Sequence, residues 1–180
     1  GVGAGPFHSQ TNEAWFTKTP GLKVVYPSFP ADAKGLLCAS INDPNPVLFF
    51  EHKALYRSIY QDVSEDYYTI EIGKASLLKE GNDITIITYG AGVHWALDTL
   101  KTHPNISADL IDLRTLQPLD EAAIFTSVRK TGKVIFLQED SLFGSMSSDV
   151  SALITENCFE FLDAPVKRVA SIETPIPFQG

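Results

Sequence analysis

The chain has 180 residues, of which 44% are hydrophobic and 20% are charged, and its formal net charge is −8. This composition excludes a disordered polymer and provides a core for one full domain, or for one domain plus a piece of another. The negative charge argues against nucleic acid as the main partner, because phosphate binding needs clustered Lys and Arg side chains. There is no signal peptide and no apolar run long enough to span a bilayer, so we expect a soluble, cytoplasmic protein that does not bind membranes.

The two cysteines are expected to be reduced packing residues. Cys38 and Cys158 each lie in an apolar helical pattern, and neither belongs to a CxxC or zinc-binding spacing. They therefore predict packing rather than chemistry.

The first part of the chain predicts one strand–helix–strand unit. Residues 23–28 and 46–51 are apolar runs typical of buried strands, and residues 30–43 place apolar side chains at helical spacing after a proline. This order of elements predicts a parallel crossover. Residues 58–82 carry scattered charge and weak periodicity, with one possible strand pair, and indicate a linker.

From residue 83 onward, strands and helices alternate. We expect Asp120 to cap one of these helices and Gly132 to end it. The pattern indicates an α/β fold with a doubly wound sheet or three-layer sandwich. The expected strands are residues 84–90, 106–114, 133–140 and 165–171, and the expected helices are residues 91–103, 118–132 and 144–162.

Two glycine-rich stretches are weak candidates for nucleotide loops. The stretch TYGAG at residues 88–92 joins a strand to a helix, where phosphate can bind, but Trp95 stands at the position of the third glycine of GxGxxG. A tight structural turn is the favoured interpretation. The stretch GVGAG at residues 1–5 has no strand before it in this chain.

His8 is the main candidate for acid–base chemistry. It lies in the loop GPFHSQ, where neighbouring glycine and proline fix the backbone, and imidazole titrates near neutral pH. Gln10 and Glu13 are candidates to orient it, although they also fit the start of a helix capped by Thr11 or Asn12. The alternative is an ordinary histidine in a surface loop.

Polar groups at two other places are weaker candidates. In SINDPNP, the carboxylate of Asp43 and the helix-end carbonyls of Ser40 and Asn45 are hard oxygen donors for a cation, although spacing alone favours a simple helix stop. Glu51, His52 and Lys53 follow a buried strand, where α/β sites usually lie, or else form salt bridges at a strand end. The acids of QED at residues 138–140 also follow a strand and fit a site or an interface.

Several of these stretches together resemble one family. They include GAGPFHSQTNEAWFTKTPGLKVVYPSFPADAKGLL, NPVLFFEHKALYR, ITIITYGAGVHWAL, IDLRTLQPLD, SVRKTGKVIFLQED and DAPVKRVASIETPIPF. The chain is similar, over essentially its whole length, to the beta subunit of thiamine-diphosphate-dependent 2-oxo acid dehydrogenases of the pyruvate and branched-chain type, in the transketolase-like superfamily. The resemblance implies a C-terminal fragment: residues 1–57 from a pyrimidine-binding α/β domain, residues 58–82 as linker, and residues 83–180 as a three-layer α/β/α transketolase C-terminal domain.

The resemblance also assigns expected roles. His8 would face the thiazolium end of thiamine diphosphate, and would steer and protonate intermediates during acyl transfer to a lipoyl arm. A potassium ion would lie beside Ser40, Asp43 and Asn45, held mostly by backbone carbonyls. The cofactor-activating glutamate of the family and its Gly-Asp-Gly motif for diphosphate and Mg²⁺ do not occur in this chain. We therefore expect the fragment alone to be inactive, to bind the cofactor poorly, and to leave residues 1–57 partly disordered or covered by another chain.

The implied partners are an alpha subunit or alpha-like domain and a dihydrolipoyl acyltransferase core, in a homo- or hetero-oligomer. Pyruvate and branched-chain 2-oxo acids are both allowed as substrates. One alternative within the superfamily is a transketolase or deoxyxylulose-phosphate synthase, which the HSQ loop and FFEHKALYR disfavour. Another is a docking module, in which acidic side chains meet a basic partner domain; the candidates are Glu139, Asp140, Glu156 and Glu160.

Overall fold

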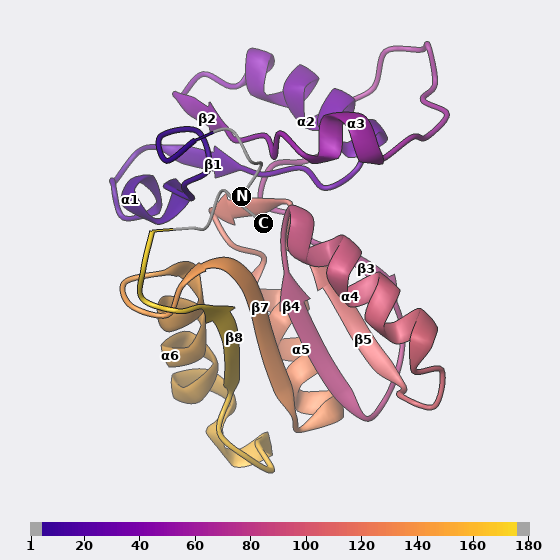
Figure 1. Ribbon diagram of the computed structural model, residues 1–180, viewed down its shortest axis with the longest axis vertical. Coiled ribbons are helices and arrows are strands. Elements are labelled where there is room, and N and C mark those ends of the chain that lie inside the picture. The colour runs from indigo at the N-terminus through magenta and orange to yellow at the C-terminus, as the bar shows by residue number, and fades with distance from the viewer. Residues whose placement is uncertain (1–4, 176–180) are drawn as a thin grey trace.

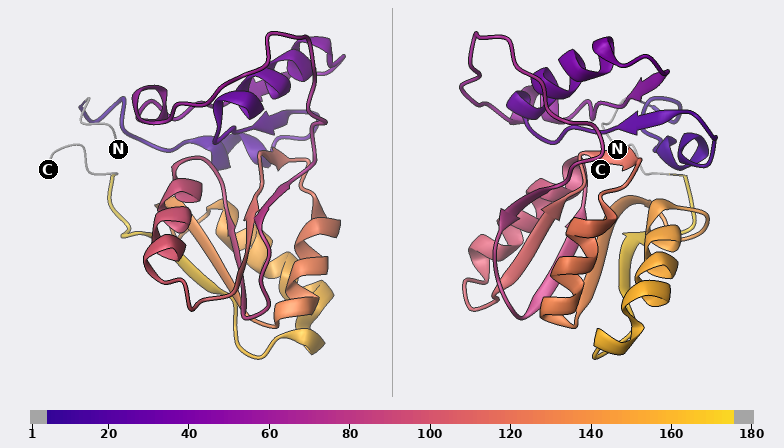
Figure 2. Two further views of the ribbon diagram at one scale, coloured as in Figure 1. Left: turned by 90° about the vertical axis from the view of Figure 1, so that its right-hand side faces the viewer. Right: turned by 180° about the vertical axis from the view of Figure 1, so that it is seen from behind.

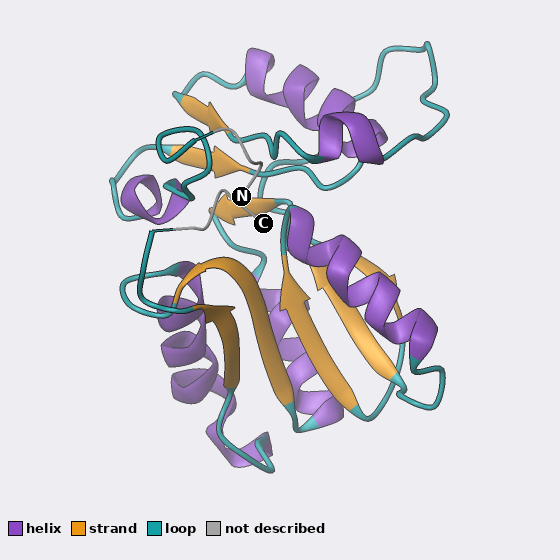
Figure 3. Ribbon diagram, viewed as in Figure 1, coloured by secondary structure: helices purple, strands orange, loops and turns teal. Residues whose placement is uncertain are grey.

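A computed structural model describes residues 5–175 of the chain. The glycine-rich stretch at residues 1–5 lies almost wholly outside the described residues. Within them, the strands form a three-stranded sheet and a five-stranded sheet, and the smaller sheet lies above the larger one in the view of Figure 3. We refer to residues 5–58 as the N-terminal part and to residues 83–175 as the C-terminal part.

The N-terminal part contains the expected parallel crossover. Strands β1 (Lys23–Val25) and β2 (Val47–Phe49) pair in parallel, and helix α2 (Pro30–Asn42) connects them, with Pro30 in its first turn. Helix α1 (Glu13–Thr17) precedes this unit and helix α3 (Leu55–Ser58) follows it. The short α1 begins after Asn12, whose side chain makes no capping hydrogen bond.

The third strand of this sheet comes from the other part of the chain. Strand β6 (Thr115–Gln117) pairs antiparallel with β1, and the N–H of Tyr26 donates to the carbonyl of Arg114 at 2.7 Å. Arg114 adopts a left-handed backbone conformation with φ of 54°, which turns the chain from the larger sheet into the smaller one. One edge of β1 is therefore covered within the same chain.

The five-stranded sheet of the C-terminal part has the order β3-β5-β4-β7-β8. Its last four strands run parallel, and β3 lies antiparallel on the edge beside β5. The edge strand β3 lies inside the segment expected to be a linker. Its sequence pattern is weak because an edge strand is held by backbone pairing with its one neighbour and needs no strong apolar pattern of its own. The bounds are β3 (Ser76–Lys79), β4 (Ile84–Thr88), β5 (Ala108–Asp112), β7 (Val134–Ser141) and β8 (Lys167–Ser171).

Helices cover both faces of this sheet, which confirms the expected three-layer α/β/α arrangement. Because side chains alternate along a strand, Ile86 packs with the face that carries helix α4 (Ala91–Thr102), whereas Ile87 packs with the opposite face. That opposite face carries helices α5 (Glu121–Thr131) and α6 (Met146–Cys158), followed by the short 3₁₀ helix η1 (Phe159–Phe161). Figures 1 and 2 show α4 on one side and α5 and α6 on the other.

The ends of α5 agree with the sequence prediction. The carboxylate of Asp120 accepts a hydrogen bond from the N–H of Ala123 at 3.2 Å, as an N-cap does. Gly132 follows the helix with φ of 67°, and a Cβ atom added there would lie 3.0 Å from a carboxylate oxygen of Asp163.

The larger of two hydrophobic clusters among the described residues joins the two parts. It includes Val24 and Tyr26 from the N-terminal part together with Ile87 and Phe136 from the C-terminal part. Tyr26 lies between the rings of Phe50 and Tyr89, at centroid distances of 5.9 and 5.3 Å. The two parts are thus packed directly on each other.

The two cysteines lie in helices α2 and α6. Cys158 is fully buried, Cys38 is half-buried, and both are free thiols. Among the described residues, the helices are too short or too polar to cross a membrane.

Candidate active site

A polar cleft of about 230 Å³ opens where the two parts meet. It lies beyond the carboxyl ends of β1, β2 and β7, which is the usual position of sites in α/β proteins. Its walls bring together two of the candidate segments from the sequence, the His8 loop and the residues after β2. The lining includes Phe7, His8, Tyr26, Glu51, His52 and Glu139.

His8 lies at this cleft, with an exposed side chain. The loop is closed by Gln10, whose side-chain amide donates to the carbonyl of Pro6 at 2.8 Å. Ser9 beside it is only 4% exposed, so the loop has a buried base beneath an accessible imidazole. This arrangement suits a proton-transfer group that must meet a molecule from outside the chain.

Two hydrogen bonds fasten the segment after His8 to the C-terminal part. The hydroxyl of Thr11 donates to Oδ1 of Asp140 at 3.1 Å, and the hydroxyl of Tyr89 donates to Oε1 of Glu13 at 2.7 Å. Glu13 is 1% exposed, and its carboxylate accepts the hydrogen bond from Tyr89 inside the protein. These two contacts and a third one, between His52 and Glu139, link the N-terminal and C-terminal parts, and we call the three together the seam.

His52 and Glu139 form the third contact of the seam. Nε2 of His52 lies 3.0 Å from Oε2 of Glu139, and the two side chains are only 8% and 14% exposed. The other ring nitrogen, Nδ1, is buried and has no hydrogen-bond partner among the described residues. The residues after β2 and the acids near the carboxyl end of β7, which the sequence indicated separately, thus meet in one place.

The seam concentrates acidic groups with shifted pKa values, which are raised for Glu13 and Asp140 and lowered for Glu139. Burial raises the pKa of Glu13, and nearby Asp140 raises it further against the opposing hydrogen bond from Tyr89. Burial also raises the pKa of Asp140, with a smaller contribution from the charge of Glu139. Carboxyls of this kind are common at functional sites, because burial and like charge both favour the protonated form.

A second buried acid lies at the carboxyl end of β5. Burial raises the pKa of Asp112 to about 7. Its Oδ2 atom makes no well-formed hydrogen bond among the described residues, and neither do the hydroxyls of Thr88 and Ser28, although the Ser28 hydroxyl lowers the pKa of Asp112 against the effect of burial. Thr88 stands beside Asp112 in the parallel register of β4 and β5.

The candidate cation residues lie at the end of α2. The carboxylate of Asp43 accepts hydrogen bonds from the ammonium of Lys23 and from the N–H and side-chain amide of Asn45 at 2.9 and 3.1 Å. The bond from Lys23, followed by that from Asn45, holds the pKa of Asp43 below its ordinary value. The hydroxyl of Ser40 donates to the carbonyl of Leu36. The carboxylate of Asp43 and the hydroxyl of Ser40 are thus engaged within the chain.

The TYGAG stretch forms a buried turn rather than an open loop. Gly90 has φ of 56° directly before α4, and a Cβ atom added to Gly92 would lie 2.1 Å from the hydroxyl of Thr88. All five of its residues are buried. This packing agrees with the favoured structural interpretation.

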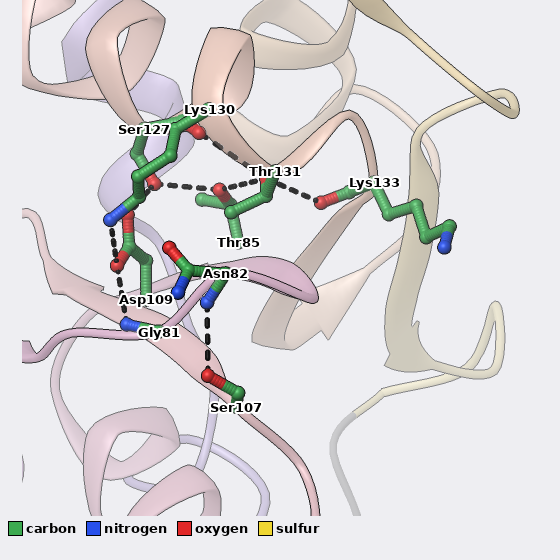
Figure 4. Close-up of polar contacts among 9 residues, drawn as sticks. All are labelled: Gly81, Asn82, Thr85, Ser107, Asp109, Ser127, Lys130, Thr131 and Lys133. Carbon is green, nitrogen blue, oxygen red and sulfur yellow. Dashed lines mark hydrogen bonds and ion pairs between the residues drawn. The ribbon is translucent and has the colours of Figure 1, made fainter.

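A separate polar cluster lies at the opposite, amino end of the strands. Asp109 is 1% exposed and accepts hydrogen bonds from the N–H of Gly81, the hydroxyl of Ser127 and the ammonium of Lys130, at 2.8, 2.6 and 2.6 Å (Figure 4). Burial raises the pKa of Asp109, but these bonds outweigh it and hold the pKa below its ordinary value. The cluster is fully paired and joins β5 to α5, which indicates a structural role.

The acidic docking candidates divide into two pairs. Glu139 and Asp140 are half-buried and bonded in the seam, so they do not form an open docking face. Glu156 and Glu160 are exposed near the end of α6. Sequence reasoning missed the role of Tyr89, although a phenol directly after a buried strand signals a hydroxyl in need of a partner.

Comparison with known proteins gives a consistent result. A family model described as "Transketolase, C-terminal domain" matches residues 73–180, and one described as "Transketolase, pyrimidine binding domain" matches residues 1–58. The chain is 51% identical over 177 residues to the 2-oxoisovalerate dehydrogenase subunit beta of Bacillus subtilis, covering 97% of this chain and 54% of that protein. It is 47% identical over 181 residues to the pyruvate dehydrogenase E1 component subunit beta of the same organism, covering 99% and 55%.

Among solved structures, the chain resembles one described as "Split gene transketolase, inactive beta4 tetramer". The TM-score is 0.75 at 26% sequence identity, and the match covers 90% of this chain and 52% of that one. The chain thus spans about half the length of the relatives that it matches.

Proposed function

The chain belongs to the transketolase C-terminal domain family, and on this premise we propose that it is part of the beta subunit of a thiamine-diphosphate-dependent 2-oxo acid dehydrogenase. The proposed reaction is decarboxylation of a 2-oxo acid and transfer of the acyl group to a lipoyl acyltransferase. The observation that carries the proposal is His8, an accessible imidazole on an anchored loop at the cleft between the two parts. The similarity to two dehydrogenase beta subunits supports it.

The residues of this chain fit one wall of a cofactor site. Thiamine diphosphate supplies a carbanion and an electron sink for decarboxylation of the 2-oxo acid. His8 would hold or deliver a proton at Nδ1 or Nε2, facing the reacting end of the bound molecules. Tyr26 and Phe7 would form the apolar side of that wall and exclude water. We propose that the diphosphate end and its Mg²⁺ are bound by another chain or segment, because the Gly-Asp-Gly motif does not occur in this sequence.

The proposal includes a potassium ion at the end of α2. Backbone carbonyls near Ser40, Asp43 and Asn45 would supply its ligands, because the side chain of Asp43 is engaged by Lys23. Such an ion would fix the turn between α2 and β2, and it takes no part in the chemistry.

We also propose the domain organisation and the partners. Residues 1–57 would belong to the pyrimidine-binding domain, and residues 83–180, together with β3 from the expected linker at residues 58–82, to the transketolase C-terminal domain. An alpha subunit would complete the cleft in an oligomer, and an acyltransferase core would receive the product. The proposed location is the cytoplasm.

The experiment uses the full-length subunit assembled with its alpha partner, thiamine diphosphate and Mg²⁺. We expect acylation of a free lipoyl domain with pyruvate or a branched-chain 2-oxo acid, and His8→Ala to lower its kcat about 100-fold or more. His103→Ala, an exposed histidine after α4, serves as the matched control and should leave the rate unchanged. Ketol transfer between sugar phosphates in place of lipoyl acylation would contradict the proposal and favour a transketolase.

A further inference from the structure

We propose that the carboxyl end of β7 positions the reacting histidine: Asp140 holds the His8 loop through Thr11, and Glu139 holds the opposite wall of the cleft through His52. The inference rests on the proposed function and adds to it the residues that set the geometry of the cleft. These are positioning residues, because they act through other side chains.

The loop that carries His8 is held at its base and not at the imidazole. His8 is exposed, so packing around its ring does not fix its position. The segment is tied instead at its base, where Ser9 is buried and the hydroxyl of Thr11 donates to Asp140. Only two residues lie between His8 and Thr11, and three steps along the chain reach about 10 Å at full extension, so the position of Thr11 restricts where the imidazole can lie.

The carboxylate of Asp140, which accepts the hydrogen bond from Thr11, is itself held in place. Oδ1 of Asp140 also accepts from the N–H of Ser141 at 2.8 Å, which orients the carboxylate. Gln138 donates to the carbonyl of Ser141 at 2.7 Å and accepts from the N–H of Ser147 at 3.0 Å, so the strand end is held against the start of α6. The strand β7 lies inside the sheet between β4 and β8. Groups on such an element keep their geometry better than groups on a loop.

Glu139 holds the opposite wall of the cleft, which is formed by His52. Successive side chains of a strand point to opposite sides, so Glu139 and Asp140 contact different segments of the N-terminal part. Glu139 lies 3.0 Å from His52, which lines the cleft after β2. Two neighbouring residues of β7 therefore hold both walls. They lie at the end of the strand, where the pairing with β8 shifts register between Leu137 and Ser141 and the hydrogen bonds of Gln138 hold the backbone.

The expected decrease in kcat depends on how far His8 moves when the Thr11–Asp140 bond is lost. A displacement of a reacting group by about 1 Å can lower a rate about 100-fold, because proton transfer needs close and aligned atoms. Loss of one hydrogen bond at the base of the loop displaces His8 only part of the time. We therefore expect a decrease of about tenfold in kcat.

The test uses the full-length enzyme assembled with its alpha partner and cofactor, with lipoyl acylation as the assay. Thr11→Val, which removes the hydroxyl and keeps the shape, should lower kcat about tenfold and change KM for the 2-oxo acid less than about twofold. Thr11→Ser, which keeps the donor, should restore kcat. Thr17→Val is the matched control, since the hydroxyl of Thr17 bonds only to Ala14 within α1.

A double-mutant cycle tests whether the loss runs through Asp140. Asp140→Ala should lower kcat at least as much as Thr11→Val, because it also removes the acceptor of the Ser141 N–H. The double variant should show no loss beyond that of Asp140→Ala, because both substitutions remove the Thr11–Asp140 contact. Additive losses, or a Thr11→Ser variant as slow as Thr11→Val, would overturn the proposal and leave a purely structural role.

The outcomes for this inference and for the proposed function are separable. If His8→Ala abolishes lipoyl acylation while Thr11→Val and Asp140→Ala keep the full kcat, the inference is wrong and the proposed function stands. If His8→Ala itself keeps the full kcat, the assigned role of His8 is wrong, and the positioning role falls with it.

Discussion

The two ends of the parallel strands treat buried polar groups in opposite ways. At the amino end, Asp109 is sealed from solvent and receives three hydrogen bonds, and the neighbouring hydroxyls of Thr85, Ser127 and Thr131 bond to one another. At the carboxyl end, five buried polar atoms have no partner within the described part of the chain. These atoms belong to Ser9, Ser28, His52, Thr88 and Asp112.

The difference separates stability from function. A buried polar group without a partner costs free energy, so a fold keeps such groups where they serve another purpose or where a further molecule completes them. The paired cluster stabilises the α5 side of the sheet. The carboxyl end carries the cleft, the seam and the acids whose pKa values are raised.

The largest effect is expected from breaking the amino-end cluster. Asp109→Ala leaves the N–H of Gly81 and the hydroxyl of Ser127 without their acceptor, so the free energy of unfolding should fall by about 3 kcal/mol in urea titrations of the intact subunit. Asp98→Ala, at an exposed position on α4, is the matched control and should change it by less than about 0.5 kcal/mol. Equal effects of the two substitutions would show that the cluster carries no special share of stability.

A smaller effect of opposite sign is expected at the carboxyl end. The folded-state pKa of Asp112, about 7, lies above its ordinary value of 3.8, so its contribution to stability is complete at low pH and is lost as the pH rises toward 7. Asp112→Asn removes the titrating group and still accepts from the N–H of Arg114. Relative to the wild type, the variant should therefore gain about 2 kcal/mol of unfolding free energy between pH 5 and pH 8.

The measurement is urea unfolding of both proteins at the two pH values. The charges nearest Asp112 are Asp32, which raises its pKa, and Arg114, which lowers it. A parallel pH dependence in the wild type and in Asp112→Asn would contradict the assignment.

The smallest effect is expected in the seam. Tyr89→Phe removes the donor to Glu13, and the free energy of unfolding should fall by about 1 kcal/mol at neutral pH. That hydrogen bond lowers a pKa that burial raises, so its loss destabilises the ionised form of Glu13 and should cost more at pH 8 than at pH 5. Tyr60→Phe, on an exposed ring, is the control and should show no such trend in thermal unfolding.

Local sequence patterns were sufficient for most of the C-terminal part. Asp120 and Gly132 cap α5 as expected, and the apolar runs became the parallel strands of the larger sheet. These features depend on neighbours within a few residues, so a single sequence carries them. Strand β6 could not be predicted in this way, since three residues after Arg114 form a strand only because β1 lies beside them.

The candidate site was predictable in its pieces and not in its assembly. Residues after β2 and near the carboxyl end of β7 stood out for their polar character, but His52 and Glu139 are 87 positions apart, and no local pattern shows that they meet. The same holds for Thr11, which fitted a helix cap and instead donates to Asp140. Such contacts depend on how the two parts pack, which the sequence of either part alone does not contain.

The exchange of β6 between the parts limits how this protein can be recombined. A chimera that swaps residues 83–180 as a cassette also replaces the strand that pairs Gln117 with Val24 and Thr115 with Val25. A foreign cassette must therefore reproduce a register in a sheet to which it does not otherwise belong. The unit that can be transplanted intact includes both sheets, and homologous shuffling at the connecting segment would select for matched pairs.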